Sequence, residues 1–250
     1  DNKLLRRRTL VVVGAIAGII AVFLFRRNLG AEYYMLHTFG LFPAGPAAAP
    51  VTAELWFELF SSRPFIGLVL SNFFDAVNGV LVFLLMLALY LVIKNTGKTL
   101  AAVFISVSAL SALIYSFTSV SFPLLVLSGH YGSGISPEEQ QCLLEAAAAI
   151  LSKNNPALPV SGFGPLMAVF LLFVSGLLAS ILMLRTGIWK RWVGIVGLVA
   201  HISGLLFFPV VWFASALCFL PMTLSAPFIV VWYAAISVKL LGMVKGEKFE

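Results

Sequence analysis

The chain has little charge and few residues with reactive side chains. Asp, Glu, Lys and Arg make up 10% of its 250 residues, and it has two cysteines and three histidines. Average soluble domains contain about 25% charged residues. Because 61% of the residues are hydrophobic, so few charges cannot cover the apolar surface in water. The composition therefore argues against a soluble domain and a disordered chain, and no nucleic-acid partner is expected.

Long, continuous apolar runs dominate the sequence instead. A membrane-spanning helix needs roughly 20 mostly apolar residues, whereas the strands of a transmembrane barrel alternate over short segments. The runs are too long and too continuous for a barrel. We therefore predict an all-α, polytopic transmembrane helix bundle that forms a single integral membrane domain over residues 1–250. Its six spans are predicted at residues 9–25, 64–93, 99–127, 162–184, 192–217 and 224–243.

The net charge of +6 is explained by membrane orientation. Lysines and arginines concentrate before the first span, in the two short connections that follow the second and fourth spans, and at the C-terminus. Most glutamates lie in the long connections 28–63 and 129–161. Cytoplasmic loops carry an excess of Lys and Arg. We expect a protein of the cell membrane, or inner membrane, with both termini cytoplasmic and both long loops outside.

The second long loop contains a strong helix-start signal. Ser136-Pro137-Glu138-Glu139 combines a capping serine, a proline at the first helical position and a glutamate at the third. Asn154-Asn155-Pro156 predicts where the helix ends. We expect an amphipathic helix over about residues 137–152 on the outer surface, either as a lid over a cavity or as a plain cap.

The first long loop is rich in aromatic residues. Its stretch AELWFELF, residues 53–60, places Trp56, Phe57 and Phe60 beside two glutamates. Such a segment is typical of a short helix lying on the outer leaflet. An ordered cap over the bundle is the alternative interpretation.

Polar side chains inside the predicted spans are few, and such residues usually have a function. Asp75 and His201 are the only carboxylate and the only imidazole there. Counted along each helix, both lie about 15 Å from the end at which the chain enters the membrane, near the midplane. We expect a polar cavity or ligand-binding site around them, or alternatively hydrogen bonds that only tie helices together. The other candidate residues are Ser71, Asn72, Asn78, Ser108, Ser111 and Tyr115.

Motifs for metals, cofactors and nucleophiles are missing. No H-x-x-x-H, H-E-x-x-H, C-x-x-C, G-x-S-x-G or Walker A pattern occurs. We predict no metal or cofactor site and assign no catalytic residue. Cys142 and Cys218 both fall on the predicted outer, oxidising side, so they form either a disulfide or two buried free thiols.

Small residues mark the faces on which helices can approach closely. Gly14 and Gly18 form a G-x-x-x-G pattern in the first span. We expect these glycines to serve packing within the chain, with a homodimer through the first span as the alternative. Further small-residue faces are Ser175, Gly176, Ala179 and Ser180 in the fourth span, and Gly197, Ala200 and Gly204 in the fifth.

Residues 71–208 resemble an uncharacterised family of polytopic membrane proteins, the domain of unknown function 4386. The resemblance rests on the span with Asp75 running into LALYLVIKNTGKTLAAVF, on the outer segment before the fourth span, and on LMLRTGIWKRWVGIVGLVA. Lys190 stands where that family usually has proline. The resemblance implies six or seven helices and no assigned activity.

Three functions remain open at this point. The first is a small transporter, carrier or sensor that uses a polar midplane cavity around Asp75 and His201. The second is a non-catalytic accessory or anchoring subunit of a larger membrane complex. The third is an intramembrane enzyme that acts on a lipid. Expected partners are membrane lipid, other membrane subunits, or a second copy of the chain.

Overall fold

The computed structural model describes residues 2–25, 50–132, 134–158, 162–213, 217 and 219–245. These residues form α-helices and no β-strand. Six of the described helices are long and apolar enough to cross a membrane. The predicted all-α bundle with six spans is therefore confirmed. The spans run over Leu5–Leu24, Phe73–Ile93, Lys98–His130, Phe163–Thr186, Arg191–Val211 and Leu220–Val244.

The described helices fall into two compact units. The first unit comprises Asp1–Ala31, Asn78–Ala112 and Val169–Glu250, and the second comprises Glu32–Val77 and Leu113–Ala168. Three helices contribute residues to both: α5 (Phe73–Ile93), α6 (Lys98–Thr118) and α9 (Phe163–Thr186). The expectation of a single domain over residues 1–250 stays a prediction, and each unit is described separately below.

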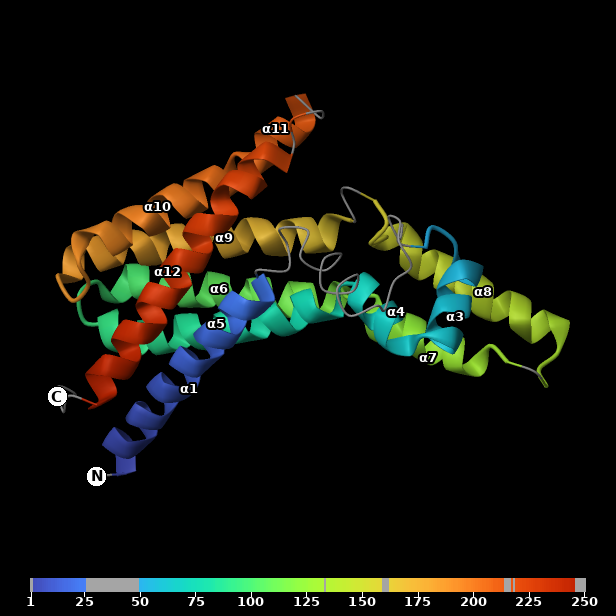
Figure 1. Cartoon of the computed structure of the whole chain (residues 1–250), viewed down its shortest axis with the longest axis horizontal. Helices are drawn as coiled ribbons and strands as arrows, with labels where there is room; N and C mark the ends of the chain where they lie inside the picture. The colour runs from blue at the N-terminus through green and yellow to red at the C-terminus, as the bar shows by residue number, and fades with distance from the viewer. Residues whose placement is uncertain are drawn as a thin grey trace. The chain divides into compact units, whose positions relative to one another are not determined.

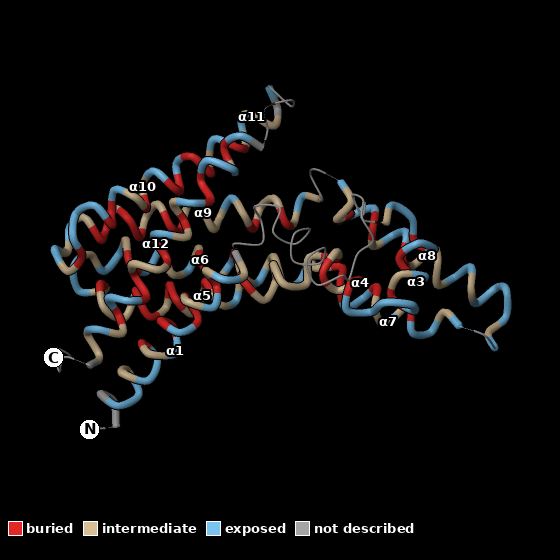
Figure 2. Tube along the Cα trace, in the orientation of Figure 1, coloured by how far each residue is buried: buried red, intermediate tan, exposed pale blue. Residues whose placement is uncertain are grey.

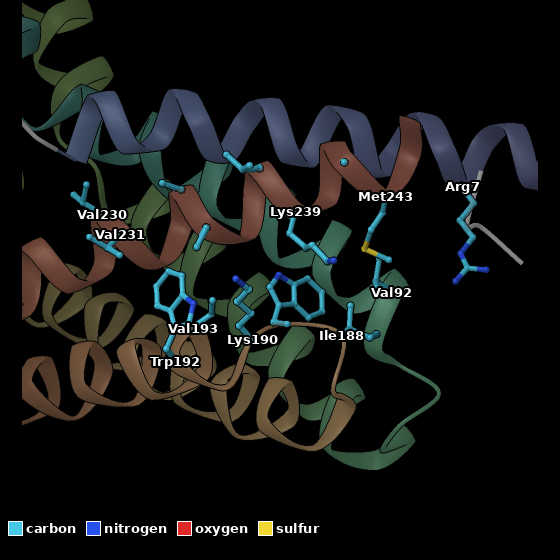
Figure 3. A pocket seen from close by; sticks show the side chains of 15 residues that line it. Arg7, Val92, Ile188, Lys190, Trp192, Val193, Val230, Val231, Lys239 and Met243 are labelled. Carbon is cyan, nitrogen blue, oxygen red and sulfur yellow. The ribbon is translucent and has the colours of Figure 1, made fainter. Parts of the chain in front are cut away.

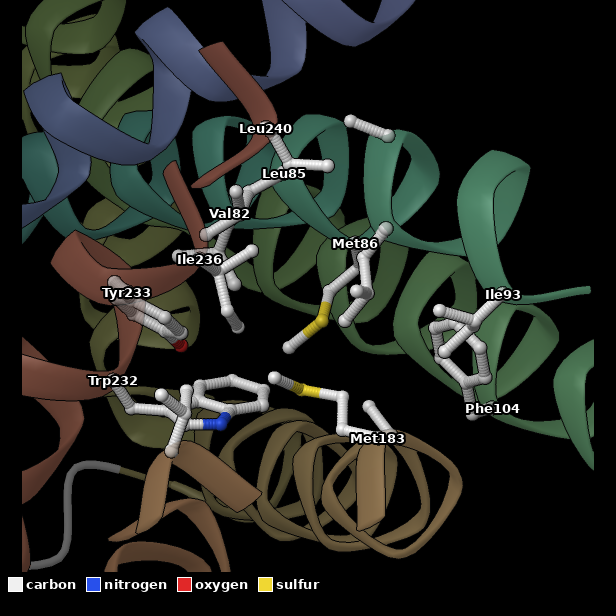
Figure 4. Close-up of a cluster of buried hydrophobic side chains, with 14 of the residues drawn as sticks. Val82, Leu85, Met86, Ile93, Phe104, Met183, Trp232, Tyr233, Ile236 and Leu240 are labelled. Carbon is white, nitrogen blue, oxygen red and sulfur yellow. The ribbon is translucent and has the colours of Figure 1, made fainter. Parts of the chain in front are cut away.

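The first unit is built around α12 (Phe219–Lys245), which packs against α1 (Asn2–Phe25) on one side and α10 (Arg191–Leu205) on the other (Figure 1). A short helix, α11 (Phe207–Phe213), continues α10. Buried residues gather on the facing sides of these helices (Figure 2). The core contains large apolar side chains from four helices, drawn in Figure 4, including Leu85, Met86, Phe104, Met183, Trp232, Ile236 and Leu240.

The glycines of the first span serve packing within the chain. A Cβ at Gly14 would overlap the side chain of Ala88 and the carbonyl oxygen of Leu84 on α5. A Cβ at Gly18 would overlap Ser237 of α12. Both glycine faces are therefore occupied by other helices of the same unit, in agreement with the intrachain interpretation of the G-x-x-x-G pattern.

The second unit has its own small core. It contains α3 (Ala53–Ser62), α4 (Pro64–Leu70), α7 (Ser121–His130) and α8 (Pro137–Lys153). Trp56, Phe57 and Phe60 of α3 are buried with Leu124 of α7 and Ala147 of α8. The aromatic face of α3 is thus covered by protein within this unit. It is not available to lie on a lipid leaflet, so that interpretation of residues 53–60 is wrong for this face.

The second predicted span is interrupted. Instead of one helix over residues 64–93, the structure has α4 and α5, separated at Ser71 and Asn72. Asn72 has a φ of 64°, a left-handed conformation that asparagine tolerates better than most residues. The carbonyl oxygen of Ser71, released by the break, accepts a hydrogen bond of 2.8 Å from the Ser121 hydroxyl. The break therefore leaves that buried group satisfied.

The third predicted span is also divided. The chain leaves helical geometry at Ser119 and Val120, between α6 and α7. The predicted bounds 99–127 therefore cover two helices and end three residues before His130.

The fifth predicted span, 192–217, is divided at Leu206 between α10 and α11 and ends earlier, at Val211. The first, fourth and sixth spans differ from prediction by a few residues at their ends.

The predicted helix after Ser136 is confirmed as α8. The Ser136 hydroxyl accepts a hydrogen bond from the Glu139 amide, and the Glu139 carboxylate accepts one of 2.8 Å from the Ser136 amide. Asn154 ends the helix, and its side-chain amide donates to the carbonyl oxygen of Thr118 at 2.7 Å. The start of α8 is therefore specified by its own side chains, whereas the Asn154 side chain bonds to a residue 36 positions earlier in the sequence.

The capping box gives a direct test of α8 stability. Ser136→Ala removes the acceptor for the Glu139 amide and should cost about 1 kcal/mol of local stability. Amide hydrogen exchange in the first turn of α8 should become faster. Ser152→Ala is the matched control, because the Ser152 hydroxyl only donates to the Ala149 carbonyl on the exposed side of the same helix. Equal exchange in both variants would contradict the capping role.

Candidate functional site

His201 lies in the first unit, at the centre of the fifth span of the chain. It is the middle residue of the span Arg191–Val211, and its side chain is completely buried. Its Nδ1 lies 2.6 Å from the carbonyl oxygen of Gly197, one turn earlier on α10. A carbonyl oxygen can only accept, so Nδ1 carries the proton and donates it. In the neutral imidazole this leaves Nε2 as a hydrogen-bond acceptor. His201 is thus central in its apolar stretch and buried in protein, whereas its depth in the membrane stays a prediction.

A glycine on α9 accommodates the other edge of the ring. A Cβ at Gly176 would overlap Nε2, Cδ2 and Cε1 of His201. Phe173, one turn away on α9, meets the ring edge-to-face at a centroid distance of 6.2 Å. Nε2 has no hydrogen-bond partner among the described residues. The imidazole is therefore fixed in position while one of its nitrogens retains an unused acceptor.

Trp232 forms the third side of the site. It is the middle residue of the span Leu220–Val244 and is completely buried. Its ring packs edge-to-face on His201, with centroids 4.7 Å apart and an interplanar angle of 76°. The indole Nε1, a donor only, also has no partner in the part of the chain that the structure describes.

The Trp232 indole and the hydroxyl of Ser180 on α9 both pack against Gly197 of α10. A Cβ at Gly197 would overlap both the Trp232 indole and the Ser180 hydroxyl, so both side chains reach the same place on α10. The Ser180 hydroxyl donates to the carbonyl oxygen of Gly176 at 2.7 Å. His201, Trp232, Gly176, Gly197 and Ser180 are called the His201 cluster below.

The chemistry of the His201 cluster is specific. It offers one acceptor, Nε2 of His201, and one donor, the indole N–H of Trp232, on two rings in contact. A buried polar group without a partner costs about 1–3 kcal/mol. The two atoms left without a partner among the described residues are thus of opposite kind, one acceptor and one donor.

Asp75 lies elsewhere, in the second unit. It is in the first turn of α5, and its carboxylate accepts a hydrogen bond of 3.5 Å from the Tyr115 hydroxyl near the end of α6. The predicted midplane depth assumed one unbroken helix from Pro64. Because the helix restarts at Phe73, Asp75 lies about 3 Å along α5 instead of halfway along a span. The assumption of one unbroken helix is therefore wrong, and the depth of Asp75 in the membrane stays a prediction.

The remaining predicted site residues are divided between the units. Ser71, Asn72, Asp75 and Tyr115 belong to the second unit, whereas Asn78, Ser108, Ser111 and His201 belong to the first. The structure joins Asp75 to Tyr115 and leaves the pairing of Asp75 with His201 a prediction. Asn78 and Ser108 are buried, and the side-chain oxygens Oδ1 of Asn78 and Oγ of Ser108 have no partner among the described residues.

The cysteine and metal predictions are tested only in part. Cys142 is exposed on α8, so the expectation of a buried thiol is wrong for this cysteine. Cys218 lies outside the described residues, so a bridge between the two stays a prediction. Within the described ranges, no group of three or more His, Cys, Asp or Glu side chains is close enough to hold a metal ion.

Sequence reasoning missed Trp232 and Ser180 as neighbours of His201. A signal for Trp232 was present. Tryptophans in membrane proteins are enriched at the two interfaces, so a tryptophan in the middle of a span is unusual and draws attention to a specific contact. Ser180 had been recognised only as a small residue for packing. Contact between α9, α10 and α12 could not be read from the chain because helix order was unknown.

Comparison with known proteins adds no relative. No family model, no curated protein and no solved structure matches the chain. The resemblance to the domain of unknown function 4386 therefore stays an expectation. The six apolar helices make the chain an integral membrane protein, and any finer function depends on the geometry above.

Proposed function

We propose that the chain is a small carrier or sensor for a polar molecule bound by the His201 cluster. The observation that supports this most directly is the unpartnered acceptor on His201 beside the unpartnered donor on Trp232. Both residues are central in their spans. Polar groups at this depth are costly, and such residues usually mark substrate or ion pathways.

The surroundings of the cluster support a binding role over simple helix association. A histidine that only ties helices together would donate and accept within the bundle. Here Nδ1 bonds to its own helix, so the imidazole contributes no hydrogen bond between helices. Two glycines, Gly176 and Gly197, leave room for the rings of His201 and Trp232. Residues of α9, α10 and α12 thus meet at two polar atoms, Nε2 of His201 and Nε1 of Trp232, that have no hydrogen-bond partner among the described residues.

Access of water-soluble reagents to the cluster tests the proposal. Ser180→Cys is made in a chain whose Cys142 and Cys218 are serine, and a membrane-impermeant methanethiosulfonate is added to right-side-out and to inverted vesicles. A carrier opens the site to each side in turn, so labelling from both sides is expected. A sensor gives labelling from one side only.

Ser175→Cys is the matched control. Ser175 lies on the same helix and is equally buried, and its hydroxyl donates to the carbonyl oxygen of Phe104 at 3.0 Å, away from His201. It should stay unlabelled. Absence of labelling at Ser180→Cys from either side, or equal labelling at both positions, would overturn the proposal. A stable copurifying partner together with no labelling would favour the accessory-subunit hypothesis.

A further inference from the structure

A groove beside α12 combines a long apolar floor with basic side chains. Its volume is about 1320 Å³, larger than the roughly 300–1,000 Å³ of most small-molecule sites. It lies in the first unit, between α12, the segment before α10 and the end of α5 (Figure 3). The His201 cluster does not contribute to it, so its role is independent of the proposed function.

The floor of the groove follows one side of α12. Val230, Ala234 and Val238 are spaced four residues apart, and Val231 and Ala235 form the adjacent row that leads to Lys239. Residues four apart lie on the same helix face. From Val230 to Lys239 the helix rises about 14 Å, close to half of a hydrocarbon core of about 30 Å. The apolar floor therefore matches the depth of one leaflet.

The polar end of the groove is positively charged. Lys190 and Lys239 are exposed and both project into the space between α12 and the start of α10 (Figure 3). Arg7 also lines it, with one guanidinium nitrogen donating to the carbonyl oxygen of Leu91 at 2.9 Å. None of the fifteen described lining residues is Asp or Glu. Lys190 and Lys239 therefore line the groove with no carboxylate among its described lining residues.

Two tryptophans complete the polar end. Trp192 is half-exposed, whereas Trp189 is only 5% exposed and its indole Nε1 has no hydrogen-bond partner in the described part of the chain. Tryptophan is enriched at the level of lipid headgroups. Both indoles line the same groove as Lys190 and Lys239, and an indole N–H is a donor only.

We propose that this groove is a binding site for an anionic phospholipid. The phosphate lies between Lys190 and Lys239, and one acyl chain runs along the apolar rows of α12 toward Val230. Lys190 and Lys239 belong to connections and helix ends rich in Lys and Arg, which predicts that the groove opens to the cytoplasmic leaflet. A zwitterionic lipid offers the same chains, but its own cation opposes the two lysines.

Lipid selectivity tests this site. The full chain is reconstituted in vesicles of equal parts phosphatidylglycerol and phosphatidylcholine, extracted in mild detergent and examined by native mass spectrometry. The wild type should retain phosphatidylglycerol preferentially. Lys190→Gln with Lys239→Gln should reduce the preference by roughly fivefold for each lysine. Lys94→Gln with Lys98→Gln removes the same charge from the connection between α5 and α6, outside the groove, and should leave the preference unchanged.

A second variant tests the apolar floor separately. Ala234→Trp fills the groove without changing its charge, so the amount of retained lipid should fall while the protein unfolds at an unchanged temperature. Equal retention of both lipids by the wild type would overturn the proposal. Equal loss in the two double-lysine variants would also overturn it, because it would show a diffuse surface charge. Neither result bears on labelling at Ser180, so the two proposals fail independently.

Discussion

Replacing Gly176 by alanine should destabilise the first unit by about 1–3 kcal/mol, the usual cost of overpacking. The new methyl group would overlap three atoms of the His201 ring. The ring cannot retreat, because Trp232 packs on it at 4.7 Å and Nδ1 is bonded to Gly197. The overlap can then be relieved only if α9 moves away from α10. Thermal unfolding in a mild detergent measures the loss.

A glycine on α5 supplies the matched control. Gly79 has nothing within 4 Å of its would-be Cβ, so Gly79→Ala should be neutral or slightly stabilising because alanine is the better helix former. His201→Ala should relieve the overlap, so the double variant with Gly176→Ala should be more stable than the sum of the single effects predicts. Additive effects would contradict the contact.

Replacing Trp232 by alanine should cost about 3–5 kcal/mol of unfolding free energy. The indole is completely buried in the core of the first unit, and truncation removes its contacts with His201 and leaves a large cavity. In a membrane such packing contacts contribute much of the association between helices. Unfolding in a denaturing detergent titration measures the change, and the apparent free energy should fall well below that of the wild type.

Trp232→Phe separates packing from hydrogen bonding. Phenylalanine keeps most of the ring volume and removes an N–H that has no partner among the described residues, so its cost should stay below about 1.5 kcal/mol. Trp192→Ala is the control for loss of an indole: Trp192 is 47% exposed, and its truncation should change stability by about 0.5 kcal/mol or less. Equal losses in Trp232→Phe and Trp232→Ala would show that the N–H, rather than the ring, is required.

Much of the architecture follows from local sequence patterns. Span number depends on the length of apolar runs, because the bilayer fixes how many helical residues are needed. The start of α8 follows from Ser136 and Glu139, whose side chains bond within the helix they define. Both kinds of signal act over a few neighbouring residues, so neither needs knowledge of the tertiary fold.

Two of the errors have one physical source. Nothing in the apolar content of residues 64–93 marks a break, since Ser71 and Asn72 can also occur inside a helix. The break is stabilised by Ser121, fifty residues later, whose hydroxyl binds the released carbonyl of Ser71. The helix along which the depth of Asp75 was counted was wrong for the same reason, because it does not continue past the break.

The sequence by itself determined an integral membrane protein with six apolar helices and His201 deep within one of them. It also identified the small residues Gly176, Gly197 and Ser180 as contact positions. Only the tertiary structure decided that Gly176 and Trp232 contact His201, and that Asp75 accepts a hydrogen bond from Tyr115. Periodicity specifies which face of a helix is apolar or small, whereas the identity of the facing helix depends on packing among all of them, which no single segment encodes.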